Sequence, residues 1–74
     1  MARYVLKSRI VDMFEIVKVR PILLYHTYAL TIKEGVTTTV QDIGIPEVGD
    51  FLTHDGTLRC LIKKKFMKHF KEVE

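Results

Sequence analysis

The sequence predicts a small α+β fold that is mostly β, either an antiparallel sheet or an SH3-like partial barrel of roughly four to five strands, with a short C-terminal helix. Three observations predict it. Two short apolar runs meet at Asp55-Gly56, large apolar residues alternate with Thr and Ala over 27–32, and apolar residues recur at helical spacing after Lys63. With 74 residues, we expect 1–74 to form one small domain.

The first part of the chain, residues 8–19, fits two structures. As a helix it would be capped by Ser8 and would present an apolar face of Ile10, Met13, Phe14 and Val17. However, its many β-branched residues and the alternation over 14–19 favour a strand. We therefore expect a strand near 13–19.

The middle of the chain reads as two strands. Pro21 lacks a backbone donor, so we expect it at a sheet edge, a bulge or the start of a strand. Residues 22–32 are rich in β-formers, 33–35 form a turn, and 36–40 form an exposed threonine-rich strand. An exposed strand of this kind can pair with another chain or with a second copy of its own chain.

A hairpin over residues 48–62 is the clearest signal in the sequence. Asp55 and Gly56 suit a two-residue loop, because a type I′ turn needs positive φ at both central positions. Gly49 and Asp50 form a turn ahead of the first arm. Because both carboxylates adjoin turn glycines, we assign Asp50 and Asp55 to turns and not to acid–base chemistry.

The tail from Lys63 to Glu74 has two interpretations. Apolar residues at helical spacing predict a helix that packs on the hairpin through Phe66 and Phe70. The alternative is one helical turn over 63–68 followed by a last strand over 69–73.

The formal net charge is +3, and the charges are unevenly distributed. Residues 34–58 contain acids but no lysine or arginine, whereas the chain from Arg59 onward is basic. A basic segment attracts acidic protein surfaces or nucleic acid. The candidate binding residues are Arg59, Lys63, Lys64, Lys65, Lys68 and Lys71. The simpler interpretation is a solvated face that keeps the domain soluble.

The sequence contains no pattern typical of an enzyme or a metal site. Cys60 is the single cysteine and sits in an apolar run, so we expect a buried thiol without catalytic reactivity. The histidines are irregularly spaced and the glycines are isolated, so we expect no metal, no cofactor and no phosphate-binding loop. No apolar run approaches the roughly 20 residues of a membrane span, and we expect a cytoplasmic protein.

Several short motifs occur in a characteristic order. They are Lys18-Val19-Arg20-Pro21-Ile22-Leu23-Leu24, Val48-Gly49-Asp50-Phe51-Leu52, Asp55-Gly56, Cys60, and Phe66 with Phe70-Lys71-Glu72-Val73. In this order they resemble a group of small uncharacterised bacteriophage proteins. Those proteins have a Lys-x-Pro strand, a (Pro/Val)-Gly-Asp-aromatic strand and a C-terminal Phe-x-x-x-(Tyr/Phe)-Glu segment. The resemblance implies that Gly49 and Asp50 shape a strand start and that Phe66 and Phe70 pack on the sheet.

The resemblance implies a phage-encoded accessory protein that binds a host protein in the host cytoplasm and modulates it, most simply by inhibition. This is the leading hypothesis, and it assigns no catalytic residue and no cofactor. The alternative is a nucleic-acid-binding protein that uses the basic segment after Arg59. A homodimer through the exposed strand over 36–40 is a third hypothesis.

Overall fold

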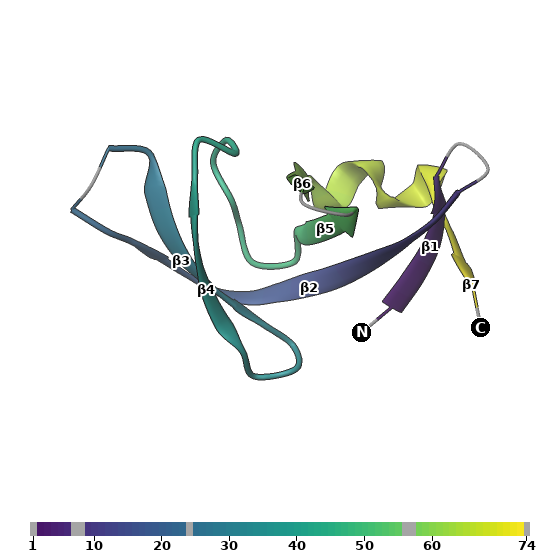
Figure 1. Cartoon of the computed structure of the whole chain (residues 1–74), viewed down its shortest axis with the longest axis horizontal. Helices are drawn as coiled ribbons and strands as arrows, with labels where there is room; N and C mark the ends of the chain where they lie inside the picture. Colours follow the sequence, from purple (N-terminus) through teal and green to yellow (C-terminus); the bar gives the residue numbers. More distant parts are fainter. Residues whose placement is uncertain (1, 7–8, 24, 56–57, 74) are drawn as a thin grey trace.

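The computed structural model describes residues 2–6, 9–23, 25–55 and 58–73, with side chains over 12–23, 25–54 and 60–70. These residues form seven strands and one 3-10 helix (Figure 1). The elements are β1 (Ala2–Leu6), β2 (Arg9–Pro21), β3 (Thr27–Ile32), β4 (Thr37–Gln41), β5 (Phe51–Asp55), β6 (Leu58–Ile62), η1 (Lys64–His69) and β7 (Lys71–Val73). All the described strand pairs are antiparallel, and the prediction of a mostly β fold is confirmed.

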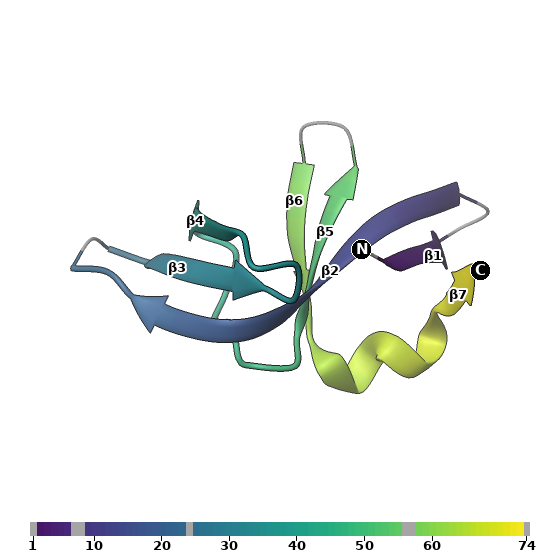
Figure 2. The same ribbon diagram turned by 90° about the horizontal axis from the view of Figure 1, so that it is seen from below.

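Strand β2 is the central strand of the sheet and pairs with three other strands. Its first half pairs with β1, its second half pairs with β3, and β5 pairs with it near the middle (Figures 1 and 2). Beyond these neighbours, β7 pairs with β1, β4 with β3, and β6 with β5. The register between β2 and β3 shifts between Ile16 and Lys18, and such a bulge bends a strand. The strands β6, β5, β2, β3 and β4 thus curl into an open half-barrel.

The strand interpretation of residues 13–19 is confirmed, and the helix interpretation is wrong. The β-branched residues of this stretch pack well on a pleated sheet and poorly in a helix. Strand β1 was not predicted, because a run of five residues carries little periodic signal. Pro21 is the last residue of β2, opposite Tyr28, which is one of the positions that its missing donor allows.

The predicted strand over 22–32 is too long at its start. Residues 22–26 lie between β2 and β3, and His26 has a φ of 53°, in the left-handed region. This reversal is closed by hydrogen bonds, from the N–H of Ile22 to the carbonyl of Thr27 at 3.1 Å and from Thr27 Oγ1 to the carbonyl of Tyr25 at 3.0 Å. β-propensity alone did not reveal the turn, because the residues that form it are themselves β-formers.

The predicted hairpin over 48–62 is present as β5 and β6. Its ladder runs from Phe51 opposite Ile62 to Asp55 opposite Leu58. Asp55 is the last residue of β5 and lies opposite Leu58, so its assignment to the two-residue loop is wrong. Gly56 lies outside the described residues.

Of the two interpretations of the tail, the helical turn followed by a strand is confirmed. The short helix η1 leads into β7, which pairs with β1 near the start of the chain. Phe70 is half-buried and Phe66 is 48% exposed, and both residues line a hollow together with Leu61 and Ile62 of β6. In the part of the chain that the structure describes, no helix has the length and apolarity that crossing a membrane requires.

The core lies on the concave side of the half-barrel. Ile16, Leu30, Val40 and Leu52 form its buried cluster, one residue from each of β2, β3, β4 and β5. Partly buried side chains pack against this cluster: Val19, Tyr28, Ile43 and Leu61. The cluster connects the β3–β4 part of the sheet with β5. Its side chains are therefore buried because the sheet curls.

We expect Leu30→Ala to lower the free energy of unfolding by about 2–5 kcal/mol, because Leu30 is fully buried and a cavity would remain. The matched control is Leu23→Ala, since Leu23 is fully exposed and its truncation should change the value by no more than about 0.5 kcal/mol. Urea unfolding measures both. Equal losses in the two variants would contradict the position of the core.

Candidate functional site

A buried carboxylate organises the chain next to the curl of the sheet. Asp50 directly precedes β5, and its side chain has no exposed surface. Oδ2 accepts hydrogen bonds from Lys63 Nζ at 2.5 Å and from the N–H of Glu47 at 2.9 Å. Oδ1 accepts one from the N–H of Lys64 at 2.9 Å. The carboxylate thus joins the loop before β5 to the junction between β6 and η1.

The hydrogen bonds around Asp50 shift the pKa values of Asp50 and Lys63. Burial raises the pKa of Asp50, but the hydrogen bonds donated by Lys63, Lys64 and Glu47 outweigh it and hold that pKa below its usual value. Hydrogen bonds to Asp50 and Glu47 raise the pKa of Lys63. Lys63 also donates to Glu47 Oε1 at 2.9 Å and to the carbonyl of Ile45 at 2.8 Å. Lys63 therefore has a structural role, and its charge is already balanced.

The remaining candidate binding residues divide into two groups. Lys64, Lys65 and Lys68 are exposed on η1, and Lys65 Nζ lies 5.2 Å from the centroid of the Phe66 ring. Arg59 and Lys71 lie in β6 and β7, and their side chains are outside the described residues. The structure therefore brings three of the predicted residues together on one short helix.

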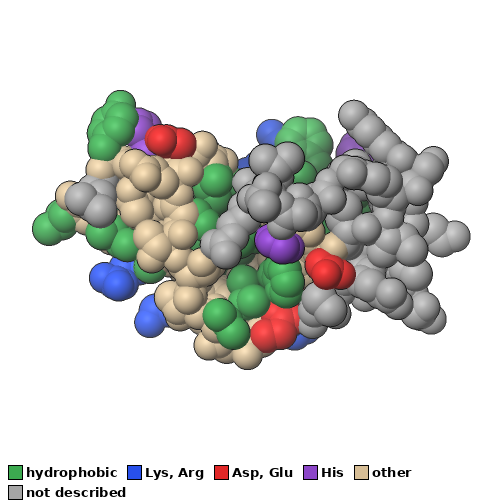
Figure 3. All heavy atoms as spheres, viewed as in Figure 1, with side chains coloured by type: hydrophobic (Ala, Val, Ile, Leu, Met, Phe, Trp, Pro, Cys, Tyr) green, Lys and Arg blue, Asp and Glu red, His purple; other side chains and the backbone are tan. Residues whose placement is uncertain are grey.

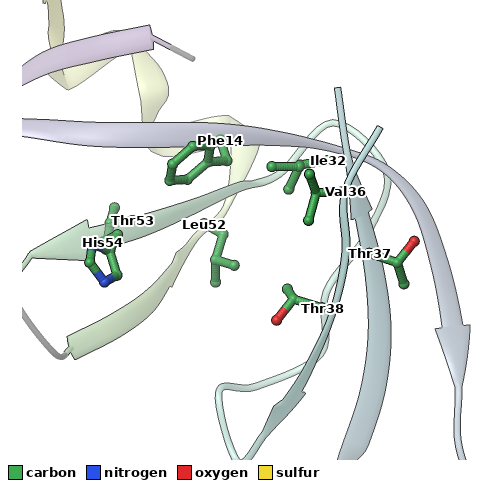
Figure 4. A pocket seen from close by; sticks show the side chains of 8 residues that line it. All are labelled: Phe14, Ile32, Val36, Thr37, Thr38, Leu52, Thr53 and His54. Carbon is green, nitrogen blue, oxygen red and sulfur yellow. The ribbon is translucent and has the colours of Figure 1, made fainter. Parts of the chain in front are cut away.

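A groove of about 420 Å³ opens on the concave side of the sheet, between the start of β4 and the end of β5 (Figure 4). Side chains from β2, β3, β4 and β5 and from the turn before β4 line it: Phe14, Ile32, Val36, Thr37, Thr38, Leu52, Thr53 and His54. The groove is of the size that accepts a side chain or a small ligand, and most of its lining is apolar.

One end of the groove is polar. His54 lies opposite Asp12 in the ladder between β5 and β2, and Leu52 lies opposite Phe14 two residues away. Because side chains alternate along a strand, Asp12 and His54 share the face of Phe14 and Leu52. Figure 3 shows, on one face, hydrophobic side chains next to a histidine near the middle of the molecule, with acidic side chains close by. A carboxylate and an imidazole therefore stand beside the apolar lining.

Sequence reasoning missed the groove. Alternation indicated which residues of each strand share a face. It did not reveal that β4 and β5, which are joined by a long loop, line opposite sides of one groove. The expectation of a buried Cys60 is wrong, since this residue is exposed. Among the residues that the structure describes, no three His, Cys, Asp or Glu side chains gather as metal ligands would.

Comparison with protein-family models, with curated proteins and with solved structures finds no match to the chain. Any assignment of function therefore depends on the chemistry of the surfaces described above.

We expect Asp50→Asn to lower the free energy of unfolding by about 1.5–3 kcal/mol near neutral pH, because it weakens charged hydrogen bonds in a buried position. Since the pKa of Asp50 is lower in the folded protein than its ordinary 3.8, the carboxylate stabilises the fold above that value. The stabilisation is lost as the pH falls through the lowered pKa, so the difference between wild type and variant should shrink in acid. Urea unfolding over a pH series measures it.

The matched control is Glu47→Gln. Glu47 shares Lys63 with Asp50, but its side chain is 60% exposed, so its replacement should have a much smaller effect. A difference between wild type and Asp50→Asn that stays constant down to the acid limit of folding would contradict the role of the charge.

Proposed function

We propose that this chain is a protein-binding module without catalysis of its own, which acts by occupying part of a partner protein's surface. The observation that carries the proposal is the groove between β4 and β5, with its apolar lining of Phe14, Ile32, Val36 and Leu52. Interfaces gain most of their affinity from a few large side chains that enter such hollows. The occupant is therefore an aliphatic or aromatic side chain of the partner.

The negative charge beside the groove indicates which charge the partner should carry there. Asp12 lies on the same face as the lining, and the chain from 34 to 58 carries acids without a lysine or arginine. An apolar anchor flanked by a basic residue would complement both features. In keeping with the resemblance to small phage proteins, we take the partner to be a host protein in the host cytoplasm, inhibited because the bound module covers its surface.

Binding fits the lining of the groove better than catalysis does. Among the described residues that line it, His54 is the ionisable one, and Asp12, opposite it in the ladder, lies outside the lining. Acid–base or nucleophilic chemistry needs a second positioned group within hydrogen-bond reach of the first. Threonines and aliphatic side chains instead suit the burial of a partner's apolar group.

We expect Val36→Glu to weaken partner binding by at least about tenfold, roughly 1.4 kcal/mol, because it places a carboxylate in the apolar lining. Val36 is 58% exposed, so the fold should tolerate the change. The matched control is Ile45→Glu, at a residue that is 73% exposed and not part of the lining. Crosslinking in host lysate identifies the partner, and calorimetry with the purified partner measures the affinity. Equal affinity of the two variants would refute the assignment to the groove.

A specific observation favours nucleic-acid binding as a second candidate function. Lys64, Lys65 and Lys68 are exposed on η1, next to the partly exposed ring of Phe66. Lysines contact phosphates, and an exposed ring can stack on a base. Because Lys63 is paired with Asp50, this surface has fewer available charges than the sequence predicts.

If this surface binds nucleic acid, the triple replacement Lys64→Gln, Lys65→Gln and Lys68→Gln should weaken binding to a single-stranded oligonucleotide. It should also make the slope of log affinity against log salt shallower by about two units, near 0.7 per phosphate contact. The control replaces Lys18, Arg20 and Lys33, which are exposed elsewhere, with Gln. Fluorescence anisotropy measures the slopes. Equal slopes for the two triple variants would rule this surface out.

A further inference from the structure

Strand β4 has an outer edge that lacks charge, proline and bulges, three of the features that usually protect such an edge. Within the described residues it pairs with β3 alone. Its five residues, Thr37–Gln41, include no charge and no proline, and its register with β3 is free of bulges. Natural edge strands are kept from pairing by lysines, prolines, bulges or a covering segment. An edge that lacks charge, proline and bulge is suited to accept another strand.

The hydrogen bonds between β3 and β4 determine which backbone groups point outward. The N–H of Ile32 donates to the carbonyl of Val36 at 2.9 Å, and the N–H of Asp42 donates to the carbonyl of His26 at 3.0 Å. The groups of residues 36 and 42 thus point toward β3, and by alternation so do those of 38 and 40. The N–H and carbonyl groups of Thr37, Thr39 and Gln41 therefore point away from β3.

We propose that this edge pairs with β4 of a second copy of the chain, antiparallel and around a two-fold axis at Thr39. Only residues with outward groups can form the hydrogen-bonded pairs of an antiparallel ladder. With the axis at Thr39, all three such residues find partners: Thr39 meets Thr39 of the second copy, and Thr37 meets its Gln41. Moving the axis along the strand would lose at least one of these pairs.

The chemistry of the strand suits a second copy. In a two-fold pairing a charged residue near the axis faces its own duplicate, and like charges that face each other are destabilising. Threonine, valine and glutamine carry no charge, and paired threonines across strands are favourable. The nearest acid, Asp42, would stand opposite Val36 of the second copy and not opposite another carboxylate.

This pairing goes beyond the proposed function and uses other atoms of β4. The groove is lined by Thr37 and Thr38 of β4, whereas the pairing uses the outward backbone groups of residues 37, 39 and 41. The two can therefore be tested separately, since variants at Phe14, a residue of β2, alter the groove without touching the edge.

Site-specific crosslinking tests the register. In a Cys60→Ser background, Thr37→Cys and Gln41→Cys proteins are prepared separately, then mixed and oxidised. In a hydrogen-bonded pair the Cα atoms lie about 5.5 Å apart, within reach of a disulfide. Two copies of residue 37 would be about 13 Å apart along the ladder, out of reach.

We expect the mixture to give disulfide-linked dimers, several-fold more than either protein oxidised alone. Equal crosslinking in the mixture and in the separate proteins would overturn the register. Failure of the mixture to crosslink at concentrations of hundreds of micromolar would overturn the pairing itself.

Solution mass provides a second, independent test. Light scattering of the wild type should show the mass approaching twice that of the monomer as the concentration rises. Thr39→Pro should remain monomeric at every concentration, because it removes an outward N–H and spares the ladder to β3. Thr39→Ala keeps that N–H and should still dimerise. A wild type that stays monomeric, or a Thr39→Pro variant that dimerises as well as Thr39→Ala, would refute the proposal.

Discussion

The position of Asp50 is the constraint on which the rest of this structure depends. Its backbone carbonyl accepts from the N–H of Ile16 at 2.8 Å, and the N–H of the preceding Gly49 donates to the carbonyl of Ile16 at 2.9 Å. Ile16 is the buried residue of β2 where the strand starts to bend. The side chain of Asp50 meanwhile holds Lys63 and Lys64. One residue therefore fixes the bend of β2, the start of β5 and the end of β6.

A buried carboxylate needs partners, because an unpaired charge in a low-dielectric interior is costly. Here the partners come from both sides in sequence, the loop before β5 and the chain after β6. Lys63 supplies the positive charge, and it also donates hydrogen bonds to the carbonyl of Ile45 and to the carboxylate of Glu47. A count of lysines therefore overstates the positive charge of the surface, because Lys63 is paired with the buried Asp50.

How much the sequence reveals depends on the range of the interaction involved. The hairpin of β5 and β6 was predictable because its turn residues and its apolar arms are neighbours. The strand over 13–19 was predictable from β-branching, and the exposed strand near β4 from its threonines. The salt bridge between Asp50 and Lys63 was not, since it joins residues 13 positions apart that share no local pattern. The groove was missed for the same reason, because its walls come from strands that meet only after the sheet has curled.

Strand β2 pairs with both β3 and β5, and this affects the order in which the chain folds. The meander of β2, β3 and β4 joins residues close in sequence, whereas β2 reaches β5 through pairs such as Asp12 with His54. Closing such distant contacts costs more chain entropy, so they form later. A nascent chain can thus assemble the meander first, leaving the middle of β2 exposed until β5 emerges. During that interval the apolar face around Phe14 lacks its partner strand and is open to misassociation.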